Sequence, residues 1–512
     1  MKHLTSGSAR NQATQTRSEP HPYLVLMTVS VCVMLYSMTV TVVNVALPQL
    51  QGALSATPDQ VAWVVTLNVV GTAVVTPMTG WLTAKLGQRY LMIGAIIGFA
   101  IASFLCATAT SLAPMLAYRI AQGGFGAPIV PLAQAIILAA FTGEKRAMAQ
   151  GIFGMAVVAG MGMAPVLGGY VAEYYDWRAI FLLLVPCSFV ALLLTLAFIR
   201  QAGKLAGLKL DWTGFVSLAI GIACLQLILD RGERFGWFES TEIILYFGSM
   251  GIAFYIFVVH TWTAEHSFFN RDLLKDRNYM VGLALVCVYG MLNFTPITLL
   301  PALLQNLKGY PDTLIGLLLA TRGTGMIAGF YIAGRMGRID PRLSMTLGFS
   351  LIGLSGFALA FLELNVSPQH IAWAGLLQGF GSGILWVPIT TATFWSLSPR
   401  LLPDGSAMYH LLRNIGQSVY IAVSFLVVVR STQMNYADLV SYINPFNELF
   451  GYQQIAGAWN TESVRSLAAL SSEVSRQARM VAYNNAFLLY GVTCFAVIPV
   501  IYLWRKRDPA AE

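Results

Sequence analysis

The chain has 512 residues, of which 56% are hydrophobic and only 11% are charged, and its formal net charge is +8. Soluble domains carry about 25% charged residues, so this composition excludes a soluble globular protein and indicates a polytopic membrane protein. The excess of positive charge is compatible with binding to nucleic acid, but the positions of the basic residues explain it better as a topology signal.

Fourteen apolar runs are long enough to cross a bilayer, which takes about 20 residues per helix. In chain order they fall near 24–46, 61–82, 90–110, 114–139, 147–171, 180–199, 213–229, 241–262, 280–304, 314–333, 343–362, 371–396, 408–429 and 483–503. Residues 1–23 are polar, and the first run is too long for a cleaved signal peptide. We therefore expect an all-α, multi-pass protein with a cytosolic N-terminal tail.

The distribution of Lys and Arg gives an independent check on this topology. With the N-terminus in the cytosol, 20 of the 31 Lys and Arg fall on the cytosolic side and 8 on the outer side. Positive residues are enriched in cytosolic loops. The even number of spans returns the basic C-terminal segment 504–512 to the cytosol as well, so both termini are predicted to be cytosolic.

Two halves of the chain carry related motifs. GWLTAKLGQR (80–89) and GRMGRIDPR (334–342) are both basic, glycine-rich turns, while QGGFGAPIVP (122–131) and QGFGSGILWVP (378–388) share a Gln-Gly start and a later proline. The sequence therefore predicts two six-helix bundles, at 24–200 and 263–503, with two inserted spans at 201–262. Repeats of this kind, with a site near the midplane between them, are typical of secondary transporters.

Residues 151–169, GIFGMAVVAGMGMAPVLGG, resemble the antiporter signature of major facilitator exporters. Gly151, Gly160, Pro165, Gly168 and Gly169 match this signature, and Ala164 stands where it has glycine. Together with VNVALP (43–48), RIAQG (119–123) and WRAIF (177–181), the motifs are similar to those of the fourteen-helix drug:proton antiporter branch of the major facilitator superfamily, of the EmrB/QacA type.

This resemblance implies a bacterial inner-membrane exporter of hydrophobic or amphipathic small molecules rather than an enzyme. The long outer segment 431–482 resembles that of family members that work with a periplasmic adaptor and an outer-membrane channel; the alternative is that it closes over an outer vestibule. The sequence has no nucleotide-binding loop, metal-ligand motif or paired catalytic carboxylates, so we expect no cofactor and no metal, and no nucleic acid as a partner.

Three arginines fall inside predicted spans, where a charge costs at least about 2.5–3.5 kcal/mol and therefore needs a reason. Arg119 and Arg413 match arginines of the resembling family, in which the first is linked to proton coupling. The alternatives are a structural role for Arg119, and packing or snorkelling to the cytosolic face for Arg413. Arg322 has no partner that the sequence assigns.

No acidic residue lies deep in an apolar run. Relatives in the resembling branch carry a proton-binding aspartate five residues before the asparagine of VNVALP, and here that position is Thr39. His410, three residues before Arg413, is a substitute that titrates near neutrality, and we hypothesise that His410 with Arg119 replaces the acid. Asp59 and Asp230 at helix ends are further candidates, and transport without proton coupling is the remaining alternative.

A cavity between the two bundles would be lined by the central spans of each. The candidate lining residues are Tyr36, Asn68, Gln134, Met163, Tyr289, Asn293, Gln305, Arg322, Gln378 and Trp386. Aromatic and methionine side chains adapt to varied apolar ligands, and hydrogen bonding between helices is the alternative role for each polar member. Because no acidic residue is expected deep in the membrane, we expect neutral, zwitterionic or anionic substrates. An uncoupled facilitator or a dedicated metabolite exporter is the alternative function.

Overall fold

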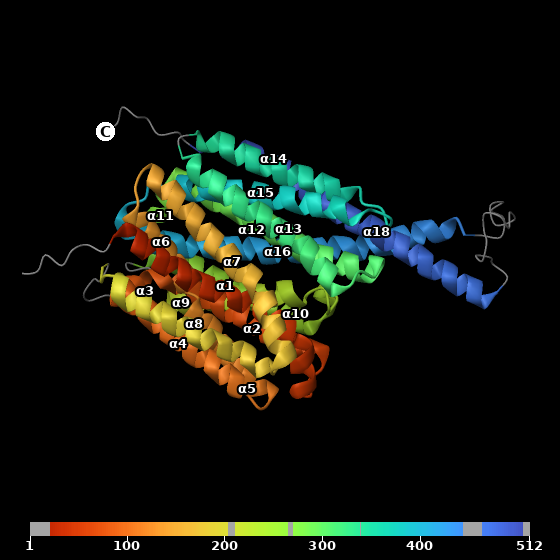
Figure 1. Cartoon of the computed structure of the whole chain (residues 1–512), viewed down its shortest axis with the longest axis horizontal. Helices are drawn as coiled ribbons and strands as arrows, with labels where there is room; N and C mark the ends of the chain where they lie inside the picture. The colour runs from red at the N-terminus through yellow and green to blue at the C-terminus, as the bar shows by residue number, and fades with distance from the viewer. Residues whose placement is uncertain (1–20, 203–209, 265–269, 338, 444–462, 505–512) are drawn as a thin grey trace, which may run out of the picture.

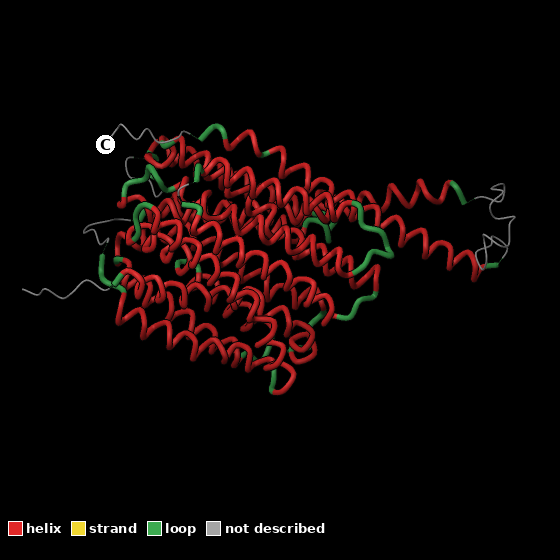
Figure 2. Tube along the Cα trace, turned by 45° about the horizontal axis from the view of Figure 1, so that its top comes forward, coloured by secondary structure: helices red, strands yellow, loops and turns green. Residues whose placement is uncertain are grey.

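The computed structural model describes residues 21–202, 210–264, 270–337, 339–443 and 463–504, and within these ranges the chain is helical and without strands (Figure 2). The longer helices are α1 (Pro22–Ala53), α2 (Pro58–Val75), α3 (Thr79–Leu86), α4 (Gln88–Thr108), α5 (Leu112–Gly126), α6 (Ile129–Ala140), α7 (Glu144–Tyr174), α8 (Trp177–Phe198), α9 (Trp212–Arg231), α10 (Thr241–Thr263), α12 (Arg277–Lys308), α13 (Asp312–Arg335), α14 (Pro341–Ala360), α15 (Pro368–Thr393), α16 (Leu402–Ser441) and α18 (Val464–Ala496). Short helices α11 (Asp272–Lys275) and α19 (Ile498–Ile501) complete the set.

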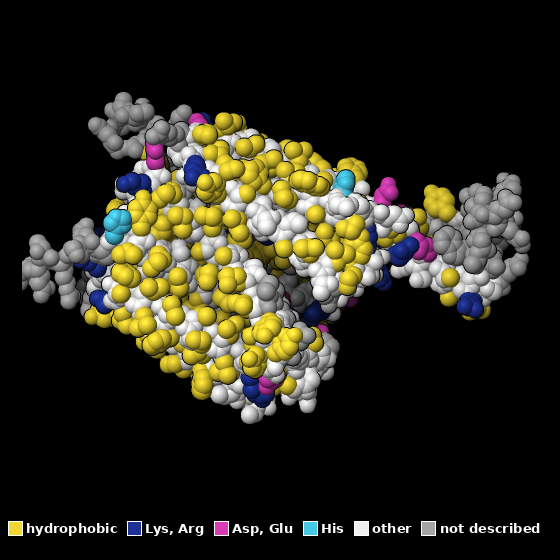
Figure 3. All heavy atoms as spheres, in the orientation of Figure 1, with side chains coloured by type: hydrophobic (Ala, Val, Ile, Leu, Met, Phe, Trp, Pro, Cys, Tyr) yellow, Lys and Arg dark blue, Asp and Glu magenta, His cyan; other side chains and the backbone are white. Residues whose placement is uncertain are grey.

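Fourteen helical stretches among the described residues are long and apolar enough to cross a membrane, which confirms the predicted number. The second span joins α2 to α3 through a short 3-10 turn at Thr76–Met78, and the fourth joins α5 to α6 at Pro128. The outer surface of these helices is broadly apolar (Figure 3). Large apolar side chains of α10, such as Tyr255 and Leu245, are more than half exposed, as expected where lipid covers them.

The packing partners of the helices repeat between the two halves of the chain. In the first half α1 packs along α7, α2 along α5, and α4 along α8. The corresponding pairs in the second half are α12 with α16, α13 with α15, and α14 with α18. This repeat confirms two six-helix bundles, the N-terminal bundle (α1–α8) and the C-terminal bundle (α12–α19), with α9 and α10 inserted between them in the chain.

The inserted helix α9 contacts both bundles. The Gln226 side chain donates to the hydroxyl of Ser418 in α16 at 2.9 Å, and the Thr66 hydroxyl of α2 donates to Asp230 at 2.5 Å. The second inserted helix, α10, packs along α9. The pair therefore covers the flank where α2 of one bundle approaches α16 of the other.

The two bundles meet at the end of the molecule where both ends of the described chain, His21 and Trp504, lie, which we call the terminal end (Figure 1). Phe153 of α7 and Phe330 of α13 belong there to one buried apolar cluster shared by both bundles. A second cluster, containing Leu303 and Phe487, is built by the C-terminal bundle alone. At the end opposite the terminal end, the surface is hollowed between the bundles (Figure 3).

The last two long helices are much longer than the predicted spans 408–429 and 483–503. Helix α16 has 40 residues and α18 has 33, which at 1.5 Å per residue gives about 60 Å and about 50 Å, beyond the roughly 30 Å of a bilayer core. Much of the predicted outer loop 431–482 is therefore helical, and residues 431–441 and 464–482 form a two-helix arm (Figure 1). Residues 444–462 lie outside the described residues.

The helical arm has a physical reason in its sequence. Leu470, Val474 and Ala478 are buried and recur every four residues, so they form one apolar face of α18. Across from them, the Tyr436 hydroxyl of α16 lies 3.0 Å from the Ser471 hydroxyl. Residues 466–480 are therefore helical, and this helix continues directly into the last span.

Candidate transport site between the bundles

Arg119 lies in the middle of α5, the first helix of the fourth span, and joins two helices of the N-terminal bundle. Its side chain is 1% exposed, and its Nε–H donates to the backbone carbonyl of Val64 in α2 at 2.9 Å. A second guanidinium N–H donates to the side-chain carbonyl of Gln122, one turn along α5. In return, the Asn68 amide of α2 donates to the carbonyl of Arg119 at 3.1 Å. Each described hydrogen bond of Arg119 is thus made within its own bundle.

Helix α1 brings Tyr36 and Thr39 to the inside of this bundle. The Tyr36 hydroxyl lies 2.9 Å from the Thr72 hydroxyl of α2. Thr39 is fully buried, and its hydroxyl donates at 3.5 Å to the carbonyl of Leu35 one turn earlier. The position of the family's aspartate therefore holds a hydroxyl that is directed at its own helix.

Arg322 occupies a related place in the C-terminal bundle, and the structure supplies the partners that the sequence did not assign. From α13, its Nη2 donates to the backbone and side-chain carbonyls of Asn293 in α12, at 2.7 and 2.5 Å. Its Nε–H donates to Gln378 of α15, and the Gln378 amide donates to Tyr490 of α18 at 3.2 Å. One buried arginine thereby connects three other helices.

A hydrogen bond from a buried arginine to a glutamine is repeated in the two bundles, as the packing of the helices is. Gln122 and Gln378 are the glutamines of the two matched motifs, and each accepts a hydrogen bond from a buried arginine. The arginine comes from span 4 in one bundle and from span 10 in the other. Because neutral amides and carbonyls satisfy both guanidinium groups, these two charges stabilise the packing of their own bundles.

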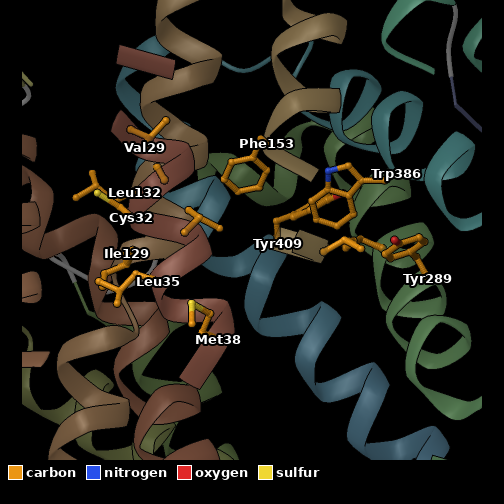
Figure 4. Close-up of a cluster of buried hydrophobic side chains, with 14 of the residues drawn as sticks. Val29, Cys32, Leu35, Met38, Ile129, Leu132, Phe153, Tyr289, Trp386 and Tyr409 are labelled. Carbon is orange, nitrogen blue, oxygen red and sulfur yellow. The ribbon is translucent and has the colours of Figure 1, made fainter. Parts of the chain in front are cut away.

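His410 and Arg413 lie one turn apart on α16, next to Trp386 of α15. The ring centres of His410 and Trp386 are 6.2 Å apart, and the Arg413 guanidinium carbon lies 5.7 Å from the centre of the Trp386 ring. The ring centres of Tyr289 in α12 and Trp386 are 5.4 Å apart. Figure 4 shows Trp386, Tyr289 and Tyr409 gathered on the side of the C-terminal bundle that is nearest Phe153 of α7.

The ten predicted lining residues lie in different parts of the structure. Tyr36, Asn68, Tyr289, Asn293, Arg322, Gln378 and Trp386 belong to the groups described above. Gln134 of α6 is fully buried and accepts a hydrogen bond from Ser406 of α16 at 3.1 Å, so it lies where the bundles meet. Met163 is 42% exposed, and Gln305 is exposed near the end of α12. For all ten residues, a role in substrate binding stays a prediction.

Glycines of the antiporter signature lie where α7 packs closely against α1 and against α13. A Cβ atom at Gly160 would lie 2.5 Å from the carbonyl oxygen of Met34 in α1, and one at Gly168 would lie 2.6 Å from a methyl group of Val42. At the start of the helix, a Cβ at Gly151 would lie 2.8 Å from the carbonyl oxygen of Phe330 in the other bundle. Ala164 is fully buried and Gly169 is half-buried, while the side chain of Pro165 lies outside what the structure describes.

Sequence reasoning missed Asp404, an acidic residue in the first turn of α16. Its side chain presses against Gly80 of α3, with no room for a Cβ at that glycine. The contact joins the two bundles at the terminal end. Because Asp404 follows the turn-like segment SPRLLP (398–403) and precedes the predicted span, the apolar pattern indicated a loop there.

A cavity of about 740 Å³ also opens at the terminal end, between the start of α7 and the facing ends of α13 and α15. Its lining includes Arg146, Met336, Pro388 and Trp395. The Arg146 guanidinium donates to the carbonyls of Phe141 and Leu138, at 3.0 and 2.8 Å, so its donors are used in holding the turn before α7.

Comparison with known proteins decides the family. The model of the family described as "Major Facilitator Superfamily" matches residues 29–421. The chain belongs to the major facilitator superfamily. It is 30% identical to the multidrug export protein EmrB of Escherichia coli K12, over 95% of this chain and 96% of that protein. It is 26% identical to the fatty acid resistance protein FarB of Neisseria gonorrhoeae, again over 95% and 96% of the two chains.

Solved structures show the same superfamily fold. The human organic anion transporter MFSD10 superposes with a TM-score of 0.60 at 15% identity, over 93% of this chain and 100% of its own. The proton:xylose symporter XylE superposes with a TM-score of 0.60 at 11% identity, over 94% and 99%. Secondary transporters bind their substrates between the two bundles. In this fold, the region between the bundles is therefore the candidate binding site.

Proposed function

We propose that this chain exports hydrophobic or amphipathic small molecules across the bacterial inner membrane by alternating access. The observation that carries the proposal is the pairing of two repeated bundles, closed at the terminal end and hollowed at the other (Figure 3). Aromatic and polar side chains gather between the bundles, as a site for varied amphipathic ligands requires. Similarity along almost the whole chain to proteins named for multidrug export and fatty acid resistance supports export as the direction.

The proposed orientation puts the terminal end in the cytosol. The topology expected from the sequence, with 20 Lys and Arg on the cytosolic side and 8 on the outer side, supports this orientation. Arg277 holds the end of the described chain there, because its Nε–H donates to the carbonyl of Leu503 at 3.1 Å. In this orientation the hollow and the two-helix arm face the periplasm, and the bundles are in an outward-facing arrangement.

The proposed driving force is proton antiport, with His410 as the titrating group and Arg119 as its coupled cation. Support comes from the burial of His410, which is 2% exposed, and from the absence of an acid at Thr39. The described contacts of His410 lie in the C-terminal bundle and those of Arg119 in the N-terminal bundle, so coupling between them would act across the site. Uncoupled transport on the same fold is the second candidate, favoured by Thr39.

Proteoliposomes test this coupling. His410→Ala is expected to abolish uptake driven by a pH gradient while leaving counterflow exchange of a neutral labelled substrate in place, because exchange needs no net proton movement. Gradient-driven transport that survives His410→Ala would contradict the coupling hypothesis without affecting the proposal of export.

We also propose that the permease works with a periplasmic adaptor and an outer-membrane channel. The arm formed by residues 431–441 and 464–482 extends from the proposed periplasmic side and carries exposed apolar residues, including Met434 and Val464. Closing over the hollow is the alternative role. Deletion of the outer-membrane channel should abolish resistance in cells but leave transport in isolated inner-membrane vesicles unchanged; resistance that persists without the channel would favour the alternative.

A drug-susceptibility screen tests export itself. Expression of this chain in a strain that lacks its major efflux pumps should raise the inhibitory concentration of several amphipathic compounds at least fourfold. An inactive control is available in Gly325→Val, which places a branched side chain against α15. Unchanged susceptibility to every compound, with the protein present in the membrane, would contradict the proposal.

A further inference from the structure

Three side chains next to one another in the C-terminal bundle have buried donors without partners. Trp386 is 4% exposed and His410 is 2% exposed, and neither the indole N–H nor either imidazole nitrogen meets a hydrogen-bond partner among the described residues. The Nε–H of Arg413 is buried and unpaired in the same way. Buried polar groups in folded proteins almost always have a partner, so a cluster of unpaired donors indicates a place where a ligand supplies the acceptor.

The half-buried Arg413 differs from the two buried arginines, Arg119 and Arg322. Arg119 and Arg322 use their donors on carbonyls and amides of their own bundles. Among the described residues, the Arg413 side chain makes one hydrogen bond, to its chain neighbour Asn414 at 3.1 Å, and takes part in no ion pair. Its positive charge is therefore the one that is free to bind a ligand anion.

The surroundings of this cluster are apolar and aromatic. Tyr289 lies against Trp386, and the Tyr409 hydroxyl is already paired, at 3.0 Å from the Thr390 hydroxyl. Across from them in Figure 4 lie Met38 of α1 and Phe153 of α7. A ligand whose charged group is bound by Arg413 would thus place its remaining surface on apolar side chains of both bundles.

We propose that Arg413, His410 and Trp386 form the subsite that binds the acidic group of an amphipathic monocarboxylate substrate. A carboxylate has two oxygens that accept hydrogen bonds in one plane, which fits the forked guanidinium, and its single negative charge matches the positive charge of Arg413. Neutral histidine has one N–H and tryptophan has one, so the ring donors add further hydrogen bonds to the same oxygens. This inference rests on the proposed export function and deepens it by naming the substrate class.

Direct binding to the full chain in lipid nanodiscs tests the proposal. The probes share one apolar body: 9-anthracenecarboxylate, 9-anthracenemethanol and 9-(aminomethyl)anthracene. We expect the wild-type chain to bind the carboxylate at least tenfold more tightly than the alcohol. Arg413→Gln should weaken carboxylate binding at least tenfold and change binding of the alcohol and the amine by less than twofold.

Two further variants and one control make the result specific. Trp386→Phe keeps the ring and removes the N–H, so it should weaken binding of the carboxylate about threefold or more and leave the alcohol unaffected. Arg430→Gln removes the same charge from an exposed position of α16 and should change nothing. Thermal unfolding of each variant shows whether it is folded. If the Arg413→Gln chain does not fold, the binding data for Trp386→Phe decide the test.

The outcomes separate this inference from the proposed function. A wild-type chain that binds the carboxylate no better than the alcohol overturns the inference, as does an Arg413→Gln chain that loses all three probes equally. In both cases export of neutral compounds, measured by susceptibility, still decides the proposed function on its own.

Discussion

At the scale of single residues, three arginines that the sequence presents alike differ in their hydrogen-bond partners. Arg119 and Arg322 each satisfy carbonyls of neighbouring helices, whereas Arg413 keeps unpaired donors beside an aromatic cluster. A guanidinium in the membrane interior is costly, and a full set of acceptors reduces that cost. The distribution of partners therefore separates structural arginines from the one assigned to ligand binding.

Substitution of Arg119 tests its structural role. Arg119→Ala leaves the Val64 carbonyl and the Gln122 side chain without their donor, so we expect a loss of about 1–3 kcal/mol in stability. Thermal unfolding in detergent measures this loss, with Arg119→Lys expected to be intermediate. An Arg119→Ala chain with unchanged thermal stability but no gradient-driven transport would instead favour a pure coupling role.

The sequence indicated several polar residues inside spans, but not their partners. It places Arg119 within a span and predicts Asn68, Asn293 and Gln378 as cavity-lining residues, and the structure buries all four side chains. The bonds of Arg322 reach α12 and α15, which are distant in the chain, and span periodicity carries no information on such contacts. Asp404 was missed for the related reason that its environment is made by α3 of the other bundle.

At the scale of helices, small residues decide how closely the central spans pack. In α13, a Cβ at Gly325 would overlap the carbonyl of Leu376 in α15, and a Cβ at Gly329 would overlap that of Phe380. Helices in membranes rely on such close approach because lipid provides no hydrophobic drive for their association. Gly325 and Gly329 therefore lie at the interface between these two helices.

Two alanine substitutions in the same helix test this interface. Gly325→Ala forces α13 and α15 apart and is expected to cost about 1–3 kcal/mol of stability. Gly323→Ala is the matched control, because nothing lies within 4 Å of a Cβ at that position, and it should be neutral or slightly stabilising. Thermal unfolding of both variants gives the comparison, and equal effects would contradict the packing role of Gly325.

The number of spans was predictable at this scale, while the lengths of the last two were not. Apolar runs of about 20 residues identify a helix that crosses lipid. Helices α16 and α18 continue into polar sequence, where the pattern no longer distinguishes helix from loop. Their continuation depends on mutual packing of residues such as Leu470 and Val474, which is visible only once the two helices are placed side by side.

At the scale of the whole molecule, the structure is closed at the terminal end by contacts between the bundles. Gly80 with Asp404, Gln134 with Ser406, and Gly334 with Met148 all lie in this closure. Alternating access requires that such contacts separate in the opposite state. Covalent closure of the terminal end should therefore stop transport.

A pair of cysteines tests this requirement. A Cβ at Gly334 would lie 3.3 Å from the Cα of Met148, so the two positions are in direct contact across the closure and cysteines there can be cross-linked. In the double variant Met148→Cys and Gly334→Cys, oxidation should reduce transport at least tenfold and reductant should restore it, while each single variant stays insensitive. Full transport after complete cross-linking would show that this end does not open.

Direction of flux in membrane vesicles tests the central claim of proton-driven export most directly. In inside-out inner-membrane vesicles with an acidified interior, the account predicts accumulation of an amphipathic substrate, collapse of that accumulation on addition of a protonophore, and no accumulation in vesicles without the protein. Accumulation that occurs only in right-side-out vesicles, or inside-out accumulation that is indifferent to the protonophore, would contradict it.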